Sequence, residues 1–331
     1  MKLFKRFSRM LPVLGGIALA LAALMPQAAL AADYPTKPIR LVVGFPPGQA
    51  TDVIARIVAK QLQDALGQAV IVDNKPGAGG INGTQEVARS PADGYTLLVS
   101  SSGPLAVNPS LYPKLPYNVE RDFEPISMLA SLPLYLAVNP TFQAQNVNEL
   151  FQVVKKAPGK FEYASAGNGV TSHLTMELIK NQFGLFLVHV PYRGSSPAVN
   201  DVVGGQVPII VDTGPAILPI ANAGKLRVLG VTTGERSSLT PQIPTIAEQT
   251  KTSFDVRAWV GIVAPKGTPA DVIAILHKAI EGAWKKPEIR SQLANLGGEA
   301  QTMKPAAFGR LIQEETVKFG RAVKLSGAKV D

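Results

Sequence analysis

The chain has 331 residues and no cysteine, and its 33 lysine and arginine residues against 24 acidic residues give a formal net charge of +9. The absence of cysteine excludes disulfide bonds, thiolate catalysis and cysteine-based metal sites. The basic residues are scattered, without a stripe or interleaved aromatic residues, so we expect attraction of small anions and no binding to nucleic acid.

The first 31 residues have the organisation of a secretory signal peptide. Four basic residues open it: Lys2, Lys5, Arg6 and Arg9. An apolar, uncharged stretch at 11–24 follows, and Ala29-Leu30-Ala31 matches the small-x-small site of a signal peptidase. A membrane anchor is the alternative, but it needs about 20 apolar residues, and this run is shorter and broken by proline and glycine. We therefore expect cleavage, export to the periplasm and a less basic mature chain from residue 32.

Downstream, apolar runs of strand length alternate with stretches of helical periodicity. We expect strands at 39–43, 69–73, 95–99, 134–138, 161–164, 187–190, 207–211, 226–231 and 258–263. Among the helices expected between them are 51–66, which ends at Gly67, then 172–183 and 269–284, the last with Thr268 as its N-cap. This alternation predicts an α/β fold with mainly parallel sheets and flanking helices, in which ligands bind at the carboxyl ends of strands.

One loop pattern occurs twice. The strand at 39–43 ends in a glycine-containing loop at 44–52, the strand at 161–164 ends in another at 165–173, and each loop leads directly into a helix. The first N–H groups of a helix have no partner inside it, and the helix dipole adds partial positive charge there. Each loop is therefore a candidate anion cradle. Two cradles predict a ligand with two acidic ends, or one acidic group held from both sides.

Two extended segments, around 132–138 and 255–263, have the character of crossings between two lobes. We predict that 32–132 together with 256–331 forms lobe 1 and that 133–255 forms lobe 2. A central ligand cleft would then have one anion cradle on each side. This is the architecture of a Venus flytrap binding protein, which closes around its ligand by hinge motion.

A series of short motifs runs along the whole mature chain. In order they are Tyr34-Pro35-Thr36-Lys37-Pro38-Ile39-Arg40, Phe45-Pro46-Pro47-Gly48 with Asp52, Asn74-Lys75-Pro76-Gly77-Ala78-Gly79-Gly80, Pro91-Ala92-Asp93-Gly94-Tyr95-Thr96, Asn108-Pro109-Ser110-Leu111-Tyr112, Tyr163-Ala164-Ser165-Ala166-Gly167, Tyr192-Arg193-Gly194 and Pro241-Gln242-Ile243-Pro244-Thr245. In this order and spacing the chain resembles the Bug-type extracytoplasmic solute receptors, which serve tripartite tricarboxylate transporters.

The resemblance implies a fold similar to the type II periplasmic binding proteins. It also implies that a carboxylate is bound largely by main-chain N–H groups of the loops 45–52 and 166–171, with ordered water. Two positions depart from the usual family pattern, because Gln49 stands in place of a glycine and Val170 in place of a serine. These departures leave the identity of the acid open, and Val170 together with Phe45 favours a less polar or aromatic acid.

The candidate ligand-binding residues of the two loops are Phe45, Gly48, Gln49, Ala50, Thr51, Ala166, Gly167, Asn168, Gly169, Val170, Thr171 and His173. The glycines allow the backbone to turn its N–H groups towards a carboxylate, although a turn that binds nothing is the alternative. Phe45 either covers the carbon frame of the ligand or packs in the core. Asp52 is expected as a first-turn acid that is favoured by the helix dipole and braces its loop.

Hydroxyl and imidazole groups near the helix starts have two possible roles each. Thr51 is expected to cap its helix or to face the ligand, and one of Thr171 and Ser172 is expected to cap the second helix. His173 either donates a hydrogen bond to a carboxylate or is buried and bonded to backbone. No two of the three histidines have metal-ligand spacing, so we predict no metal.

Further candidates follow other strands. Arg193 is suited to pair with a ligand carboxylate, or it forms an internal salt bridge or a surface charge. Asp212 holds Arg193, binds a ligand amine or caps the helix near Pro215. Ser101 and Ser102 are rim donors at the end of a strand.

These features predict a monomeric periplasmic solute-binding protein that captures a small carboxylate and delivers it, by transient contact, to membrane transporter subunits. The acid is a dicarboxylate, a tricarboxylate, an acidic amino acid or an aromatic acid. A sensor subunit of a signalling system is the alternative, since it would use the same loops. An exported hydrolase is disfavoured, because the chain has no Gly-x-Ser-x-Gly or His-Glu-x-x-His motif. We predict no enzymatic activity and no cofactor.

Overall fold

The computed structural model describes residues 34–329, and the residues from Lys37 onward form one compact unit. The signal peptide predicted for 1–31 lies outside the described residues. The strands are β1 (Ile39–Val43), β2 (Val70–Asn74), β3 (Thr96–Ser101), β4 (Phe123–Val138), β5 (Glu162–Ser165), β6 (Val188–Pro191), β7 (Ile209–Thr213), β8 (Arg227–Val231), β9 (Arg257–Pro265) and β10 (Glu299–Ala300). The helices are α2 (Ala50–Leu66), α3 (Ile81–Ala88), α4 (Asn108–Leu111), α5 (Val119–Asp122), α6 (Val147–Lys156), α7 (Thr171–Phe183), α8 (Ser195–Val203), α9 (Gly214–Asn222), α10 (Ile246–Thr250), α11 (Ala270–Trp284), α12 (Pro287–Asn295) and α13 (Pro305–Ser326), with short helical turns η1 (Ala78–Gly80) and η2 (Gly103–Val107).

Each predicted strand overlaps a strand of the structure, since apolar runs of four to six residues are a local signal. The main difference is β4, which begins at Phe123 rather than at 134. Its first part contains two prolines and two serines, so its sequence lacks the pattern of a strand. The predicted cap of the helix at 269–284 is also wrong, because Pro269 is the N-cap of α11 while the Thr268 hydroxyl donates to the Pro265 carbonyl.

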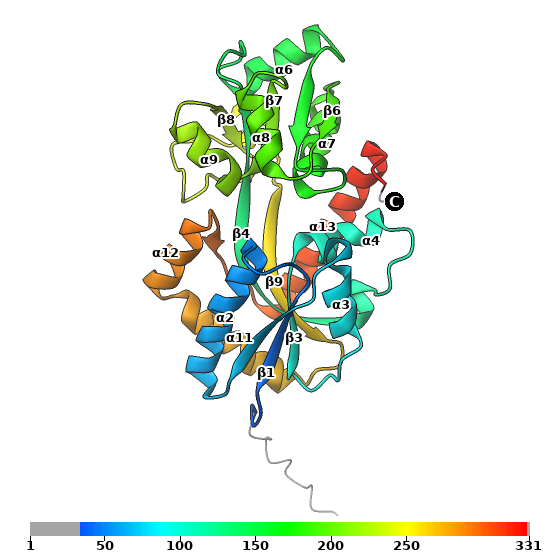
Figure 1. Cartoon of the computed structure of the whole chain (residues 1–331), viewed down its shortest axis with the longest axis vertical. Coiled ribbons are helices and arrows are strands. Elements are labelled where there is room, and N and C mark those ends of the chain that lie inside the picture. Colours follow the sequence, from blue (N-terminus) through cyan, green and yellow to red (C-terminus); the bar gives the residue numbers. More distant parts are fainter. Residues whose placement is uncertain (1–33, 330–331) are drawn as a thin grey trace, which may run out of the picture. The chain divides into compact units, whose positions relative to one another are not determined.

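The strands join in the order β2-β1-β3-β9-β4-β7-β5-β6, with β8 and β10 also paired to β4. β1 is parallel to β2 and β3, and β5 is parallel to β6 and β7. The long strands β4 and β9 run side by side and antiparallel, and they add antiparallel pairs to these parallel sets (Figure 1). The result is an α/β fold in which β4 connects two groups of parallel strands.

β4 changes partners along its length. Residues from Phe123 to Pro133 pair with β9, whereas those from Leu134 to Val138 pair with β7 and β8. The division into lobes at 132/133 and 255/256 stays a prediction, and this exchange of partners falls beside the first of its boundaries.

Aromatic residues of α13 and α11 contact the long strands β9 and β4. Phe308 of α13 is fully buried, and its ring packs edge-on against that of Trp259, with 5.4 Å between centroids. Trp284 of α11 donates from its indole nitrogen to the Leu129 carbonyl of β4 at 2.6 Å. These contacts hold both long strands in place from the helical side.

The parallel strands decide where the loops meet. Because the carboxyl ends of parallel neighbours lie at one edge of a sheet, the segments that follow β5, β6 and β7 share an edge, and so do those that follow β1, β2 and β3. In the part of the chain that the structure describes, no helix combines the length and apolar character needed to cross a membrane.

Candidate functional site

Asp52 braces the first loop, residues 44–52. Its side chain is only 2% exposed, and the carboxylate accepts hydrogen bonds from the Gly48 backbone N–H at 2.8 Å, from Arg56 Nε at 3.0 Å and from Asn74 Nδ2 at 2.9 Å. Asn74 also donates to the Phe45 carbonyl at 3.0 Å. The expected bracing role of Asp52 is confirmed, and Asn74 at the end of β2 is a partner that the sequence did not reveal.

The charge of Asp52 is stabilised by this arrangement. Burial alone would raise its pKa, but the hydrogen bonds from Arg56, Gly48 and Asn74 outweigh burial and hold the pKa of the carboxyl below its usual value. Asp52 is therefore ionised at neutral pH, and its charge is satisfied by the loop itself. The carboxylate of Asp52 is turned into the protein, towards Gly48, Arg56 and Asn74.

Glycines let the neighbouring turn η1 approach the first loop closely. A Cβ atom on Gly44 would lie 2.7 Å from the Gly80 carbonyl oxygen, and one on Gly83 would lie 2.8 Å from the Gly44 Cα. The Phe45 ring packs over Gly80, where a Cβ would lie 3.1 Å from the ring. This packing explains the glycine-rich motif at 74–80 as the support of the loop, and it places half-buried Phe45 against protein on at least one side.

The first turn of α2 keeps free N–H groups. The prediction that Thr51 caps this helix is wrong, because Gln49 is the N-cap and makes no side-chain cap bond. Gly48, at φ +86°, turns the chain into the helix as predicted. The backbone nitrogens of Ala50, Thr51 and Asp52 have no intrahelical acceptor, and no bond from them to another described residue is found. They are the donors that the first turn of α2 leaves without a partner inside the helix.

In the second loop, residues 165–173, side chains of the loop itself accept hydrogen bonds from many of its backbone N–H groups. The N–H groups of three of its residues donate within the loop and helix start: Ala166 to Ser172 Oγ at 3.1 Å, Gly167 to Ser165 Oγ at 3.2 Å and Gly169 to His173 Nδ1 at 2.9 Å. Asn168 is exposed, and its side chain donates to the Lys329 carbonyl. In this structure the loop therefore uses most of its early N–H groups to fix its own shape.

The N–H groups of this segment that have no acceptor inside the helix lie at the start of α7. Val170 is the N-cap, so the prediction that Thr171 or Ser172 caps the helix is wrong. The backbone nitrogens of Thr171, Ser172 and His173 occupy the first turn, where no intrahelical acceptor exists. Val170 is 38% exposed beside them, which places an apolar surface next to the N–H groups.

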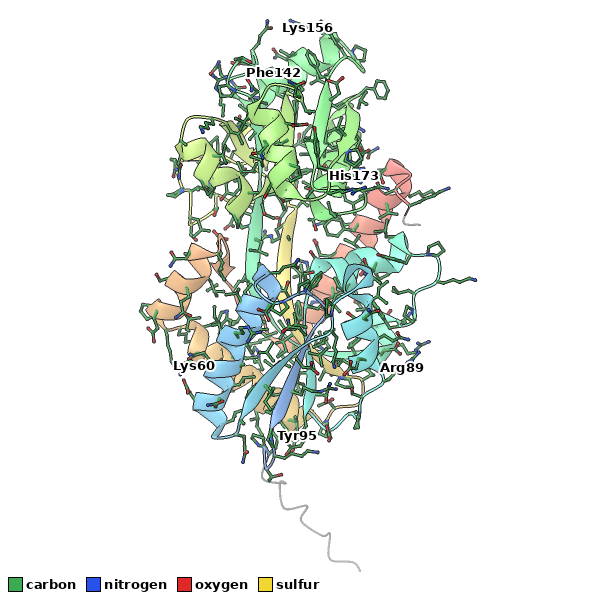
Figure 2. All side chains as sticks on the ribbon, viewed as in Figure 1. Lys60, Arg89, Tyr95, Phe142, Lys156 and His173 are labelled. Carbon is green, nitrogen blue, oxygen red and sulfur yellow. The ribbon has the colours of Figure 1, made fainter. Side chains whose placement is uncertain are left out.

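Two histidines lie beneath this loop. His173 is buried at the start of α7 (Figure 2), and its ring stacks on that of His189 from β6 with 3.8 Å between centroids and 6° between planes. Burial lowers the pKa of both imidazoles to about 4. The expectation of a buried, backbone-bonded His173 is the alternative that matches this geometry.

A buried acid lies next to the stack. Glu177 accepts from the Tyr163 hydroxyl at 2.6 Å and from Lys180 Nζ at 2.6 Å, and its Oε1 is 3.9 Å from His173 Nε2. The charges of Glu177 and Lys180 act in opposite directions on the pKa of both histidines, since Glu177 raises it and Lys180 lowers it. Among the described residues, no group of three or more metal-binding side chains has the geometry to hold an ion.

The remaining candidates are spread over neighbouring segments. Arg193 is exposed after β6 and makes no ion pair with a described residue. Ser101 is half-buried at the end of β3, and Ser102 is 1% exposed, so the Ser102 side chain faces the interior. Gly194 donates its N–H to the Ala166 carbonyl at 3.0 Å, which ties the Arg193 segment to the second loop.

Asp212 is buried at the end of β7. Its Oδ1 accepts from the Thr213 N–H at 2.7 Å, while its Oδ2 is buried without a partner among the described residues. Two of its predicted roles are wrong, because Thr213 is the N-cap of α9 and no ion pair joins Asp212 to Arg193. The third role, binding a ligand amine, stays a prediction.

Asp212→Asn should make the chain at least as stable as the parent at pH 7. Burial raises the pKa of Asp212 above 3.8, so the folded state holds this proton more tightly than the unfolded chain, and stability is lost as pH rises through the folded pKa. Asparagine removes that loss. Urea unfolding at pH 7 and pH 4 would show the gain at pH 7 only. A less stable variant at pH 7 would mean that the carboxylate is ionised and paired.

A cavity of about 420 Å³ lies between α8 and α9. These helices follow β6 and β7, so the cavity is at the same sheet edge as the second loop, which follows β5. Its polar lining comes from Ser195, Ser196, Asn200 and Thr213, and its apolar lining includes Val199, Pro215 and Ile220. Hydroxyl groups beside an apolar wall suit a small acid with a carbon frame.

Comparison with known proteins decides the family. Residues 54–327 match the family described as "Tripartite tricarboxylate transporter family receptor". The chain belongs to this receptor family. BugT of Bordetella pertussis is 39% identical over 325 residues, which cover 98% of this receptor and 99% of BugT. The resemblance to the Bug-type receptors is thereby confirmed.

Two solved structures share the fold of this receptor. Rpa4515 of R. palustris, solved with adipate, is 31% identical with a TM-score of 0.75 and covers 90% of this chain and 100% of its own. MatC of Rhodopseudomonas palustris, with bound malate, is 30% identical with a TM-score of 0.70 and covers 88% of this chain and 100% of its own. The predicted two-lobed periplasmic binding fold is confirmed.

Several supporting residues of this receptor could not be predicted from the sequence. His189 is separated from the second loop along the chain, yet parallel pairing of β5 and β6 places it opposite Tyr163. Its one signal was a histidine between two valines in a short strand. Ser165 and Glu177 gave no signal, since their partners come from other segments.

Proposed function

We propose that this chain is a periplasmic receptor that captures a small carboxylate and delivers it to the membrane subunits of a tripartite tricarboxylate-type transporter. Both solved relatives described above hold dicarboxylates, adipate in one and malate in the other. The proposed mature receptor starts near residue 32, works as a monomer and has no enzymatic activity.

The observation that carries the proposal is the pair of helix starts at α2 and α7. Each follows a strand and presents three first-turn N–H groups, and each is shaped by an internally bonded loop. Backbone donors that are already fixed lose little entropy when they bind an anion. Hydrogen bonds to a charged group contribute about 1.5–3 kcal/mol each. The free energy of a few such bonds, after the free-energy cost of domain closure is subtracted, is sufficient for a dissociation constant of about 1 μM.

The surroundings of α7 favour an acid with a carbon frame. Exposed Val170 lies beside the free N–H groups, and the cavity between α8 and α9 opens at the same sheet edge. Arg193 is available for a second carboxylate. We therefore propose a dicarboxylate or an aromatic acid as the cargo, ahead of citrate-like acids.

A thermal-shift screen of the chain from Ala32 onward tests this function. Adipate, malate, citrate, glutamate and benzoate would be compared, with adipamide as the uncharged control for adipate. An acid at 100 times its dissociation constant stabilises a fold by about 2.7 kcal/mol, which gives a clear shift. We expect a shift with at least one acid and none with adipamide. No shift with any acid, in protein refolded to remove bound solutes, would contradict carboxylate capture.

A further inference from the structure

The backbone of the second loop is held by two imidazoles. His173 Nδ1 accepts the Gly169 N–H at 2.9 Å. His189 Nε2 lies 2.7 Å from Ser165 Oγ, which in turn bonds both the N–H and the carbonyl of Gly167. Gly167 and Gly169 both have positive φ, at 148° and 73°, so these bonds hold backbone that would otherwise be free to change shape.

The hydrogen bonds fix the tautomer of each ring. Nδ1 of His173 is an acceptor, so its proton is on Nε2, on the side of Glu177. Ser165 has one proton, which it donates to the Gly167 carbonyl at 3.0 Å, so His189 Nε2 must be the donor in its bond with Ser165. His173 is therefore neutral in the arrangement that satisfies its partners, whereas His189 can donate to Ser165 in either protonation state and is kept neutral at pH 7 by burial, which lowers its pKa to about 4.

We propose that neutral His173 and His189 are positioning residues that hold the second loop in its anion-binding shape, and that protonation of the pair releases the loop. The consequence for cargo rests on the proposed function, whereas the effect on the loop does not. A periplasmic receptor with this loop would bind its carboxylate ligand more weakly at low pH.

Protonation would act on the loop in two ways. A proton on Nδ1 of His173 would face the Gly169 N–H, so that two donors oppose each other at hydrogen-bond distance. Two imidazolium rings stacked at 3.8 Å would also repel each other. The ionisable groups that face the pair are Glu177 and Lys180 of α7 and Tyr163 of β5, and Lys180 neutralises Glu177.

The direction of the pH effect follows from the low pKa of the two rings. Each has a pKa of about 4 in the folded loop, below the ordinary value of 6.5 that it would regain when exposed. Between these values the open loop binds protons that the closed loop does not, so the closed shape is stable above pH 6.5 and is progressively lost as pH falls towards 4.

The test is amide hydrogen exchange of the peptide spanning 165–173, expressed as protection factors between pH 7.5 and 4.5 in the ligand-free chain. His173→Asn keeps an acceptor near the Nδ1 position and His189→Gln keeps a donor near the Nε2 position, and neither new side chain titrates. His173→Leu removes the acceptor. His277→Asn, on α11 and distant in sequence from the loop, is the matched control.

We expect protection in the parent chain and in His277→Asn to fall at least tenfold between pH 7 and pH 5. The double variant His173→Asn/His189→Gln should keep its protection at pH 7 and lose the pH dependence, and His173→Leu should be poorly protected throughout. A pH-independent parent, or an unchanged pH dependence in the double variant, would overturn the proposal. If His173→Leu does not fold, the double variant alone decides.

Adipate and malate titrations at pH 7 and pH 5 give the link to cargo. For whichever acid binds, acidification should weaken binding more in the parent chain than in the double variant. The acid's own titration affects both chains equally, so the difference reports on the histidines. Equal weakening in both chains would overturn a role in cargo release. If neither acid binds the parent at pH 7, the proposed function fails for these probes, and hydrogen exchange still decides the positioning role.

Discussion

Replacing Asp52 with alanine should lower the free energy of unfolding by about 2 kcal/mol and weaken carboxylate binding at least tenfold. The buried carboxylate holds the Gly48 N–H, Arg56 and Asn74 together, so its loss leaves partly buried donors without an acceptor. The free N–H groups of α2 would then have to be ordered at the expense of binding energy. Urea unfolding and calorimetric titration with the acid that gives the largest shift in the screen, adipate being the first tried, would measure the two effects.

Asp64 offers a matched control on the same helix. It is 47% exposed on its side chain and pairs with Lys60 at the same i, i+4 spacing at which Asp52 pairs with Arg56. Lys60 lies on the outer face of α2 (Figure 2). Asp64→Ala should change the free energy of unfolding by no more than about 0.5 kcal/mol, because exposed pairs contribute little. Equal losses from Asp52→Ala and Asp64→Ala would contradict the bracing role.

Gly261→Ala should destabilise the chain by about 2–3 kcal/mol through overpacking. Gly261 is in β9, paired with Ser100 of β3 on one side and Met128 of β4 on the other, so its backbone cannot move away from Phe308. An added Cβ would overlap the ring of Phe308, which is fully buried and already packed against Trp259. The loss would appear as a lower midpoint in urea unfolding with an unchanged slope.

Gly282→Ala provides the opposite expectation with the same chemical change. Gly282 is exposed near the end of α11, and a Cβ there would have no atom within 4 Å. Alanine favours the helix over glycine by about 0.5–1 kcal/mol, so this variant should be more stable than the parent. A Gly261→Ala protein as stable as Gly282→Ala would mean that Phe308 moves without cost.

The strands and the two loops were open to prediction because their signals are local. The segment 39–50 contains, within twelve residues, a strand, a turn at Gly48 that needs positive φ and a helix start. The role of Asp52 was accessible for the same reason, since Gly48 lies only four residues away. The capping predictions at Thr51, Thr171 and Thr268 failed by one or two residues, because hydroxyl residues close to a helix start have similar sequence patterns inside and outside it.

By itself, the sequence determined the alternation of strands and helices, the two glycine-containing loops at helix starts and the series of motifs that marks the receptor family. Only the tertiary structure decided how those loops are supported. The stack of His173 on His189, the link from Asn74 to Asp52 and the packing of Gly44 on Gly80 each join segments that are distant along the chain. Such contacts depend on strand order and register, which are set by the packing of the whole sheet and leave no pattern in any one segment.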